Sequence, residues 1–294
     1  MTKRNFQAAT KPSRTRLLFI QRAFSCDAAL VAYCNKTLEI LDRSDTGMQS
    51  NAESNAAAQH DPAKGASKVD LAPITRHARL GDMAYEAMKE QLVRGHFLPR
   101  CKLTVRGVAD ALGVSSTPAR DALNRLTAEG ALQYSGPKTV IVPYLTMEAL
   151  QEVTAMRLAL EGLAAKRGAK NTRPGLPEAL EEMQARMNDG LEKRRYADVL
   201  WTDKEFHFAV YRQSDMPHLV STIEALWLRI GPSSHDLYTD FATQRSGLYN
   251  HQVVVESLRE GDAESVGAAF ERDIRDGYRC LKRAIRARGE QVSD

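Results

Sequence analysis

Residues 103–126, LTVRGVADALGVSSTPARDALNRL, contain two short amphipathic segments separated by a turn. Apolar residues recur at three- and four-residue spacing in each segment, which predicts two helices with one buried face each. The buried faces comprise Val105, Val108, Ala109 and Leu112, then Ala119, Ala122, Leu123 and Leu126. Gly113 can take the positive φ that ends the first helix, Ser115 can cap the second, and Pro118 is tolerated in its first turn. This stretch predicts a helix-turn-helix, whose second helix normally enters the major groove of DNA.

The flanking segments extend this motif. Residues 80–93 have the pattern of an amphipathic helix, which a turn at Gly95 and a loop around Pro99 follow. Residues 131–134 and 139–142 alternate in polarity on either side of the turn 135–138, so they predict a β-hairpin. Three helices followed by a hairpin form a winged helix-turn-helix.

Residues 80–143 resemble the DNA-binding domain of the GntR family of bacterial regulators, without a gap. The matching residues are Leu80-Gly81-Asp82, Arg94-Gly95, Leu103-Thr104, Leu112-Gly113-Val114-Ser115, Thr117-Pro118-Ala119-Arg120, Ala122-Leu123, Arg125-Leu126 and Glu129-Gly130. Periodicity alone does not distinguish a helix-turn-helix from a plain helical bundle, because short helix pairs occur in both. The resemblance implies a transcription regulator that binds double-stranded DNA.

The resemblance also assigns DNA contacts. It places Arg106 and Arg120 toward the DNA, although both could be solvated helix charges. Ser115 and Thr117 fall where small hydroxyls meet phosphates or base edges. Ser116 departs from the many relatives that carry arginine there, and an arginine can read guanine with two hydrogen bonds. The wing tip, Gly136 and Lys138, is expected at the minor groove or its phosphates.

Composition and charge bound the remaining classes. A chain of 294 residues has room for two domains, and 43% apolar with 27% charged residues is typical of globular proteins. The net charge is +3 over residues 1–70, +4 over 71–145 and −3 over 146–294, so the expected DNA-binding part attracts phosphate. The four cysteines form no CxxC pair, which indicates reduced thiols. No apolar run approaches the roughly 18 residues of a membrane helix, and we expect a cytoplasmic, nucleoid-associated protein.

Residues 1–70 are interpreted as a mobile or disordered extension. Residues 1–24 are basic and lack acids, residues 15–40 could form a helix, and residues 44–70 have the composition of a linker. The basic start also resembles a transit peptide. Met48 is a possible initiator, which leaves open whether residues 1–47 are translated.

From residue 146 onward the pattern is entirely helical, so the predicted fold class is mostly α with one small hairpin. We expect six helices in an antiparallel bundle, over residues 147–170, 177–193, 196–214, 217–230, 244–260 and 262–288. Bundles of this kind place ligand and metal sites between their helices. The predicted domains are therefore 71–145 for DNA binding and 146–294 for effector binding and dimerisation.

This second region resembles the all-helical effector (FCD) domain of the FadR branch of the same family, and six helices suit its VanR-like subgroup. The matching residues are Arg157-Leu158-Ala159-Leu160-Glu161, Ala164-Ala165, Asp203, Phe206-His207, His251 and Glu260-Gly261-Asp262-Ala263. The resemblance implies a small organic acid as effector and a homodimer that binds an inverted repeat.

A metal site is predicted from four residues. Asp203 and His207 are four apart, so a helix places both on one face, and His251 supplies a third ligand from another helix. The resembling family usually completes the site with a late histidine, where this chain has Asp273. The carboxylate favours harder divalent metals over zinc, with ions of the zinc, nickel or manganese type as candidates. The alternative is that these residues are ordinary polar groups on helix surfaces.

Two arginines are candidates to bind the effector carboxylate. Arg157 has the guanidinium fork that matches a carboxylate, but it could instead pair with Glu161 one turn later. Arg229 is a second candidate. We therefore predict a regulator, expected to be a repressor, whose operator affinity responds to a small acid. The alternatives are a metal-dependent hydrolase using Asp203, His207 and His251, and a DNA-binding protein without an effector.

Overall fold

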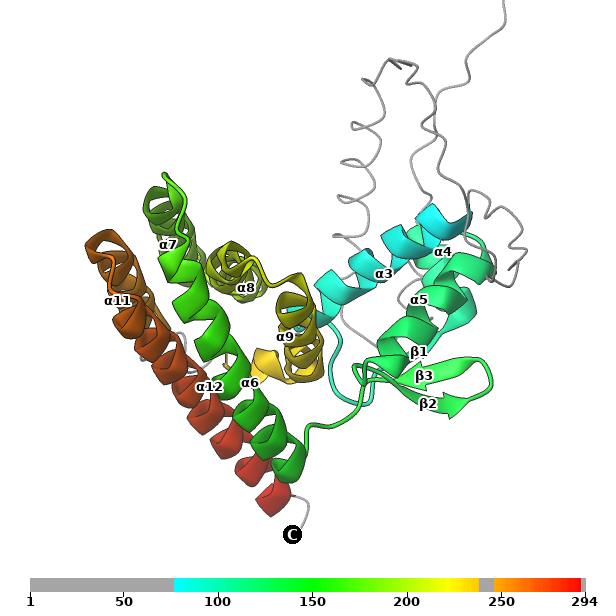
Figure 1. The fold of residues 1–294 in the computed structure, drawn as a ribbon. Coiled ribbons are helices and arrows are strands. Elements are labelled where there is room, and N and C mark those ends of the chain that lie inside the picture. Colours follow the sequence, from blue (N-terminus) through cyan, green and yellow to red (C-terminus); the bar gives the residue numbers. More distant parts are fainter. Residues whose placement is uncertain (1–76, 238–245, 292–294) are drawn as a thin grey trace, which may run out of the picture.

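The computed structural model describes residues 77–237 and 246–291 (Figure 1). The predictions for residues 1–70 lie outside these ranges. A small domain with three strands lies beside a larger helical bundle, and a short segment before residue 147 connects them. No helix in the described ranges is long and apolar enough to cross a membrane.

The first domain is the winged helix-turn-helix that the sequence predicts. Its elements are α3 (His77–Val93), β1 (Lys102–Thr104), α4 (Val105–Leu112), α5 (Ser116–Ala128), β2 (Gln133–Gly136) and β3 (Thr139–Ile141). The strands form an antiparallel sheet in the order β1-β3-β2, in which Val140 pairs with Leu103 on one side and Tyr134 on the other. The sequence analysis missed β1, because three residues are too few to show an alternating pattern.

The turn between α4 and α5 follows the expected chemistry with one exception. Gly113 has φ of 67° and ends α4 in the left-handed region, as predicted. Ser115 occupies the N-cap position of α5, but its side chain makes no capping hydrogen bond. Thr104 caps α4 instead, since its hydroxyl accepts a hydrogen bond from the backbone nitrogen of Gly107 at 3.0 Å.

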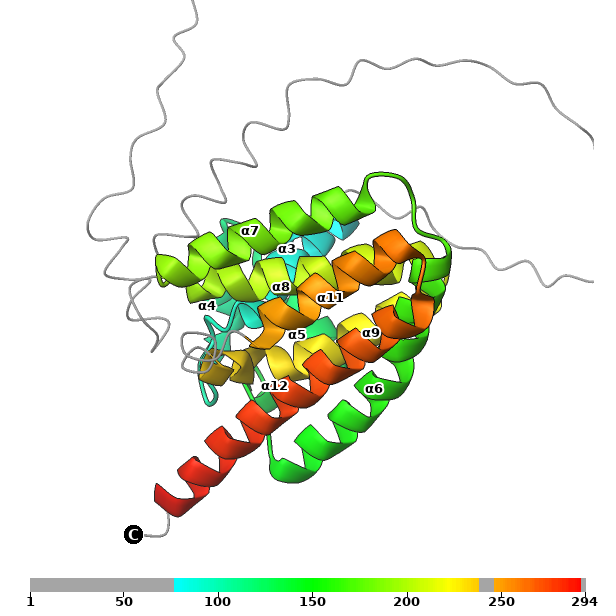
Figure 2. The same ribbon diagram turned by 90° about the vertical axis from the view of Figure 1, so that its left-hand side faces the viewer.

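The second domain is a bundle of six α-helices within the described residues (Figure 2). The helices are α6 (Met147–Lys170), α7 (Leu176–Glu192), α8 (Tyr196–Tyr211), α9 (Pro217–Ile230), α11 (Ser246–Glu260) and α12 (Ala263–Gln291). Short 3-10 turns follow α8 and α9, as η1 (Arg212–Ser214) and η2 (Gly231–Leu237). The prediction of an all-helical domain is confirmed, although η1 belonged to the expected third helix and η2 was not expected.

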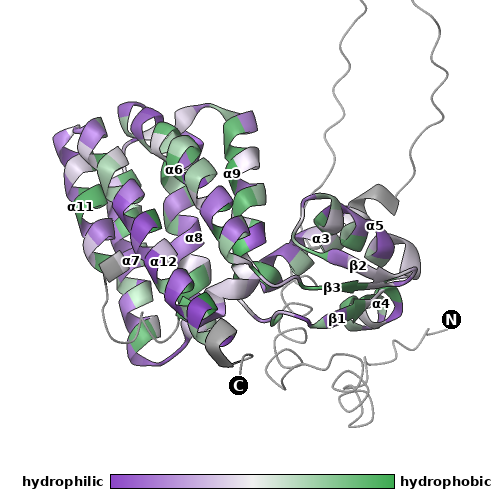
Figure 3. Cartoon of the chain, turned by 90° about the horizontal axis from the view of Figure 1, so that it is seen from below, coloured by the Kyte–Doolittle hydropathy of each residue, from purple (hydrophilic) through white to green (hydrophobic). Residues whose placement is uncertain are grey.

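Hydrophobic and hydrophilic residues alternate along each helix of the bundle (Figure 3), and a cluster of apolar residues is buried between the helices. The buried core includes Phe206, Phe208, Tyr211 and Phe270. Among the described glycines, the tightest approach of a neighbouring backbone is at Gly168, where an added Cβ would lie against the carbonyl oxygen of Val210. A side chain is therefore excluded at this position of α6.

The two domains share an interface that buries both apolar and charged groups. Leu228 of α9 belongs to the apolar core of the winged domain. Arg94, just beyond α3, pairs with Asp198 of α8 at 2.8 Å, and Lys89 pairs with Glu224 of α9 at 3.1 Å. The last turn of α3 is thus anchored to the bundle.

Gly168→Ala should lower the free energy of unfolding, because its Cβ meets a backbone carbonyl that cannot move aside. We expect a loss of about 1–3 kcal/mol. Gly277→Ala on α12 is the matched control, because its Cβ meets no atom within 4 Å. The control should gain up to about 1 kcal/mol from helix propensity. Urea denaturation of both variants measures the difference, and equal stabilities would contradict the close approach at Gly168.

Candidate DNA-binding surface and metal centre

The side chains predicted to contact DNA lie at the surface of the winged domain. Arg106 is 86% exposed at the side chain, with only a long contact of 3.8 Å to Asp110. Arg120 and Lys138 are also exposed, and Gly136 is half-buried in β2. The three hydroxyl residues at the start of α5 are exposed as well, and they are Ser115, Ser116 and Thr117. These groups are free to reach a nucleic acid, as the sequence analysis expects.

Two neighbouring contacts of α5 were not predicted. Arg125 pairs with Asp82 at 2.6 Å and lies over the ring of Tyr85, so it holds α5 against α3. Tyr134 of β2 donates a hydrogen bond to Asn124 Oδ1 at 2.9 Å. The second contact joins the wing, β2 and β3, to the recognition helix α5. Predicting it would require the pairing register of the hairpin, which the sequence alone does not give.

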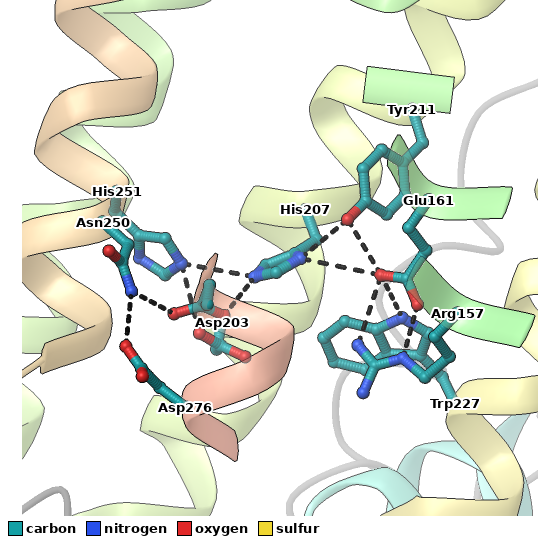
Figure 4. A network of polar contacts seen from close by, with 10 residues as sticks. Arg157, Glu161, Asp203, His207, Tyr211, Trp227, Asn250, His251 and Asp276 are labelled. Carbon is teal, nitrogen blue, oxygen red and sulfur yellow. Dashed lines mark hydrogen bonds and ion pairs between the residues drawn. The ribbon is translucent and has the colours of Figure 1, made fainter. Parts of the chain in front are cut away.

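The four predicted metal ligands converge inside the bundle, and Figure 4 labels three of them, Asp203, His207 and His251. Asp203 and His207 come from α8, His251 from α11 and Asp273 from α12, and one ligand atom of each lies within 4.8 Å of the others. His207 Nε2 lies 3.3 Å from both His251 Nε2 and Asp273 Oδ2. Asp203 Oδ1 lies 3.5 Å from His251 Nε2.

These distances fit a divalent ion. An ion bound at about 2.0–2.2 Å places neighbouring ligand atoms roughly 3.0–3.5 Å apart, which matches the three contacts of the cluster. The Nε2 atoms of both histidines face each other. Two unprotonated Nε2 atoms would repel one another through their lone pairs, so this arrangement requires a proton or a cation between them. The donor set of two imidazoles and two carboxylates suits a first-row divalent metal.

A chain of hydrogen bonds orients His207. Its Nδ1 lies 2.9 Å from the hydroxyl of Tyr211, which donates to Glu161 Oε2 at 2.9 Å. The Tyr211 oxygen therefore accepts from His207 Nδ1–H, which leaves Nε2 as the nitrogen that would bind a metal after losing its proton. Such outer partners set the tautomer and ring orientation of metal-binding histidines.

Glu161 is a fully buried carboxylate on α6 with several donors around it. Arg157 binds both of its oxygens, and Trp227 donates from Nε1 to Oε2 at 3.1 Å. The Arg157 guanidinium also stacks on the Trp227 ring, 4.5 Å from its centroid. The ion pair considered as the alternative role of Arg157 is thus present.

Burial and neighbouring charges shift the pKa values of the cluster. Burial raises the pKa of Asp203 to about 7 and lowers the pKa of His251 to about 3. Burial also opposes the charge of His207, but the hydrogen bond to Asp273 and the nearby carboxylates outweigh it and raise the pKa of His207. Burial and Glu161 raise the pKa of Tyr211, which keeps its proton for donation.

A cavity of about 80 Å³ lies beside the cluster. Its wall includes Asp203 and Asp273, Arg157 on α6, Val93 at the end of α3, and Gly231 at the start of η2. An ion held by the cluster would be reached from this cavity past its two carboxylate ligands. The cavity therefore borders both the metal position and the winged domain.

Arg229, the second candidate for the effector carboxylate, lies on α9 away from the cavity. It does not line the cavity, and its Nε donates to the backbone oxygen of Glu129 at 3.1 Å, at the end of α5. The assignment of Arg229 to the effector stays a prediction, and the contact that the structure gives this residue is with the winged domain. Its position on the last turn of α9 points it across the domain interface.

The sequence analysis also missed the polar groups behind the ligands. Tyr211 follows His207 by one helical turn, and Glu161, considered above only as a partner of Arg157, follows Arg157 by the same spacing. Asn250 precedes His251, and its amide donates to Asp273 at 3.4 Å and to Asp276 at 3.2 Å. The first two could have been found by asking which residues share a face with a predicted ligand.

Comparison with known proteins agrees with this geometry. Residues 80–141 match the model of the bacterial regulatory proteins of the gntR family, and residues 152–276 match the FCD domain. The HTH-type transcriptional regulator McbR of Escherichia coli is 30% identical over 191 residues, which cover 64% of this chain and 86% of that protein. A probable D-xylose utilization operon transcriptional repressor of Paenarthrobacter nicotinovorans is 29% identical over 163 residues, which cover 53% of this chain and 69% of that protein.

Solved structures show the same fold. The structure of E. coli McbR/YncC superposes with a TM-score of 0.66 at 28% identity, covering 70% of this chain and 98% of that one. The crystal structure of a GntR regulator from Rhodococcus sp. RHA1 superposes with a TM-score of 0.58 at 18% sequence identity, and this similarity supports the fold alone. The chain belongs to the GntR family, as a FadR-type regulator with a winged helix-turn-helix and an FCD domain. It is a DNA-binding transcriptional regulator and not the metal-dependent hydrolase considered above.

Arg120→Ala should weaken binding to the operator and leave the fold unchanged, because Arg120 is exposed on the recognition helix. The loss of one base contact with two hydrogen bonds costs about 1–3 kcal/mol. The exposed Arg186 of α7 provides the matched control, Arg186→Ala, which removes the same charge far from α5 in sequence. Gel-shift titrations at fixed salt compare the two, and equal affinities would remove Arg120 from the interface.

Proposed function

We propose that this regulator binds an inverted-repeat operator as a homodimer and changes its operator affinity when a small carboxylate ligand enters the FCD domain. A single winged domain reads one half-site, and the two-fold symmetry of a dimer matches an inverted repeat. Repression that the ligand relieves is the mode we favour, in the cytoplasm. Two of the matched relatives carry the word repressor in their names.

The cluster of Asp203, His207, His251 and Asp273 beside a cavity carries this proposal. These four residues would hold a divalent ion of the zinc, nickel or manganese type. The bound ion would supply an electropositive anchor for a ligand oxygen. Arg157 lines the same cavity and keeps N–H groups beyond those that bind Glu161, so it could donate to the ligand as well.

The position of the cavity supports a direct effect on the winged domain. Val93 is the last residue of α3 and forms part of the cavity wall. At Gly231, on the same wall, an added Cβ would lie 2.9 Å from the backbone oxygen of Leu92. A ligand in the cavity would therefore act on the backbone contact between α3 and η2. Coupling between such sites is typically about 1–3 kcal/mol, or roughly 5–150-fold in affinity.

A regulator without an effector would have no use for this arrangement. Burying two carboxylates and two imidazoles around one point is unfavourable unless a cation or a proton compensates. An apolar cluster of similar volume would stabilise the bundle better. The polar cluster beside a cavity therefore favours ligand binding over a purely architectural role.

His207→Ala should remove the metal, because the remaining ligands would compete poorly with water. The wild-type chain should carry about one divalent ion, and its loss should lower thermal stability because the ion ties α8 to α11 and α12. His218→Ala is the control, since His218 is exposed on α9. Elemental mass spectrometry and melting curves of protein purified without chelator measure both effects. A metal-free wild type that still responds to its ligand would contradict the proposed site.

Metal affinity should rise with pH between about 6 and 8. Burial raises the pKa of Asp203 to about 7, and the pKa of His207 is also raised, so both hold protons that the ion must displace. His251 is already neutral there, because its pKa is about 3. The dissociation constant for Mn²⁺ should fall by at least about tenfold per pH unit below pH 7. Calorimetric titrations in buffers of different ionisation enthalpy count the released protons, and a flat profile would oppose this assignment.

A further inference from the structure

The wall of the cavity beside the metal cluster has more acidic than basic side chains, although we propose that the cavity binds a carboxylate. Among the described residues that line it, three are carboxylates, Asp203, Asp273 and Asp276, and the one cationic side chain is Arg157. The rest of the wall is largely apolar, with Val93, Leu150, Leu200, Ile230, Ile274 and Leu281. The ligand must therefore match both negative charge and an apolar surface.

The charges of this wall nearly cancel even with an ion present. Asp203 and Asp273 would neutralise a divalent ion, whereas a set of one carboxylate and three imidazoles would leave one positive charge. Glu161 already neutralises Arg157 with two hydrogen bonds. A simple carboxylate ion would therefore enter a site without net positive charge, and its Coulomb attraction to the ion would be offset by the nearby carboxylates.

Asp276 adds a negative group at one side of the cavity. Asn250 donates to both Asp273 Oδ1 and Asp276 Oδ2, so one amide links the two carboxylates. Arg279 pairs with Asp276 at 2.6 Å, but its side chain is 65% exposed and solvent screens its charge. Asp276 itself is 23% exposed at the side chain, so it retains the capacity to accept a further hydrogen bond from a ligand in the cavity.

We propose that the cavity takes a small zwitterion, an α-amino acid with a short apolar side chain, whose carboxylate faces the metal position and Arg157 and whose ammonium group faces Asp276. This inference rests on the proposed function of the site. The volume limits the side chain, since about 80 Å³ is roughly half of the 150 Å³ cavity that holds a benzene molecule. The apolar wall covers the side chain, and the two charged ends meet groups of opposite sign.

Three compounds of equal carbon length test the proposal. L-Alanine, L-lactate and propionate share the three-carbon body and the carboxylate, and they differ in an ammonium group, a hydroxyl group or a hydrogen on the α-carbon. Calorimetric titration of each into the full chain loaded with Mn²⁺ measures the dissociation constants. L-Alanine should bind about tenfold or more tightly than propionate, the scale of one charge-assisted hydrogen bond, and L-lactate should lie between them.

Variants at position 276 separate the ammonium contact from general effects. Asp276→Asn should lower the affinity for L-alanine to about that for propionate and leave the affinity for propionate unchanged. Asp276→Glu keeps the negative charge, so this variant should still bind L-alanine more tightly than propionate. Glu264→Gln removes a carboxylate from the exposed start of the same helix and should change neither affinity. Melting temperatures of all variants show that the fold is retained.

The remaining outcomes separate this inference from the proposed function. Tighter binding of propionate, or an L-alanine preference that survives Asp276→Asn, would overturn the zwitterion and leave a carboxylate effector in place. Binding of none of the three to the loaded protein would also overturn the zwitterion. The proposed function is judged independently, by the metal content of the chain and by its binding to the operator.

Discussion

The buried carboxylate of Glu161 is the constraint around which the effector domain is arranged. A charge without exposure is unfavourable in a bundle core unless donors surround it. Arg157 satisfies it from the same helix, Tyr211 from α8 and Trp227 from α9, so three helices are held in one register. Because Tyr211 in turn accepts from His207, the same carboxylate decides which nitrogen of His207 faces the proposed metal.

The second feature of the structure is the contact between the effector domain and the end of α3. Leu228 enters the apolar core of the winged domain, and Arg94 and Lys89 form ion pairs with the bundle. The cavity wall includes Val93, so ligand chemistry and domain docking share one boundary. A site in the middle of an isolated bundle would need a longer route to the DNA-binding helices.

Particular residues show where sequence reasoning succeeded and where it did not. The four predicted ligands converge, because two lie one turn apart on α8 and the others come from helices packed beside it. The contact of Arg229 with the end of α5 was not predicted, because a position on a helix does not determine which neighbour faces it. Ser115 occupies the N-cap position of α5 without a capping hydrogen bond. Thr104 caps α4, which the sequence analysis did not predict because Thr104 also ends the undetected strand β1.

The sequence alone determined the α-helices and the two domain types, though not β1 or η2, because helix periodicity, Gly113 and Pro118 act over a few residues. It also supplied the family and the four predicted ligand residues, whose binding of a metal stays a prediction. Only the tertiary structure decided which groups meet across helices: Glu161 behind His207, Asn250 between Asp273 and Asp276, and Val93 in the cavity wall. These contacts join positions 40 or more residues apart or depend on how two helices cross, and packing of the whole core sets such relations.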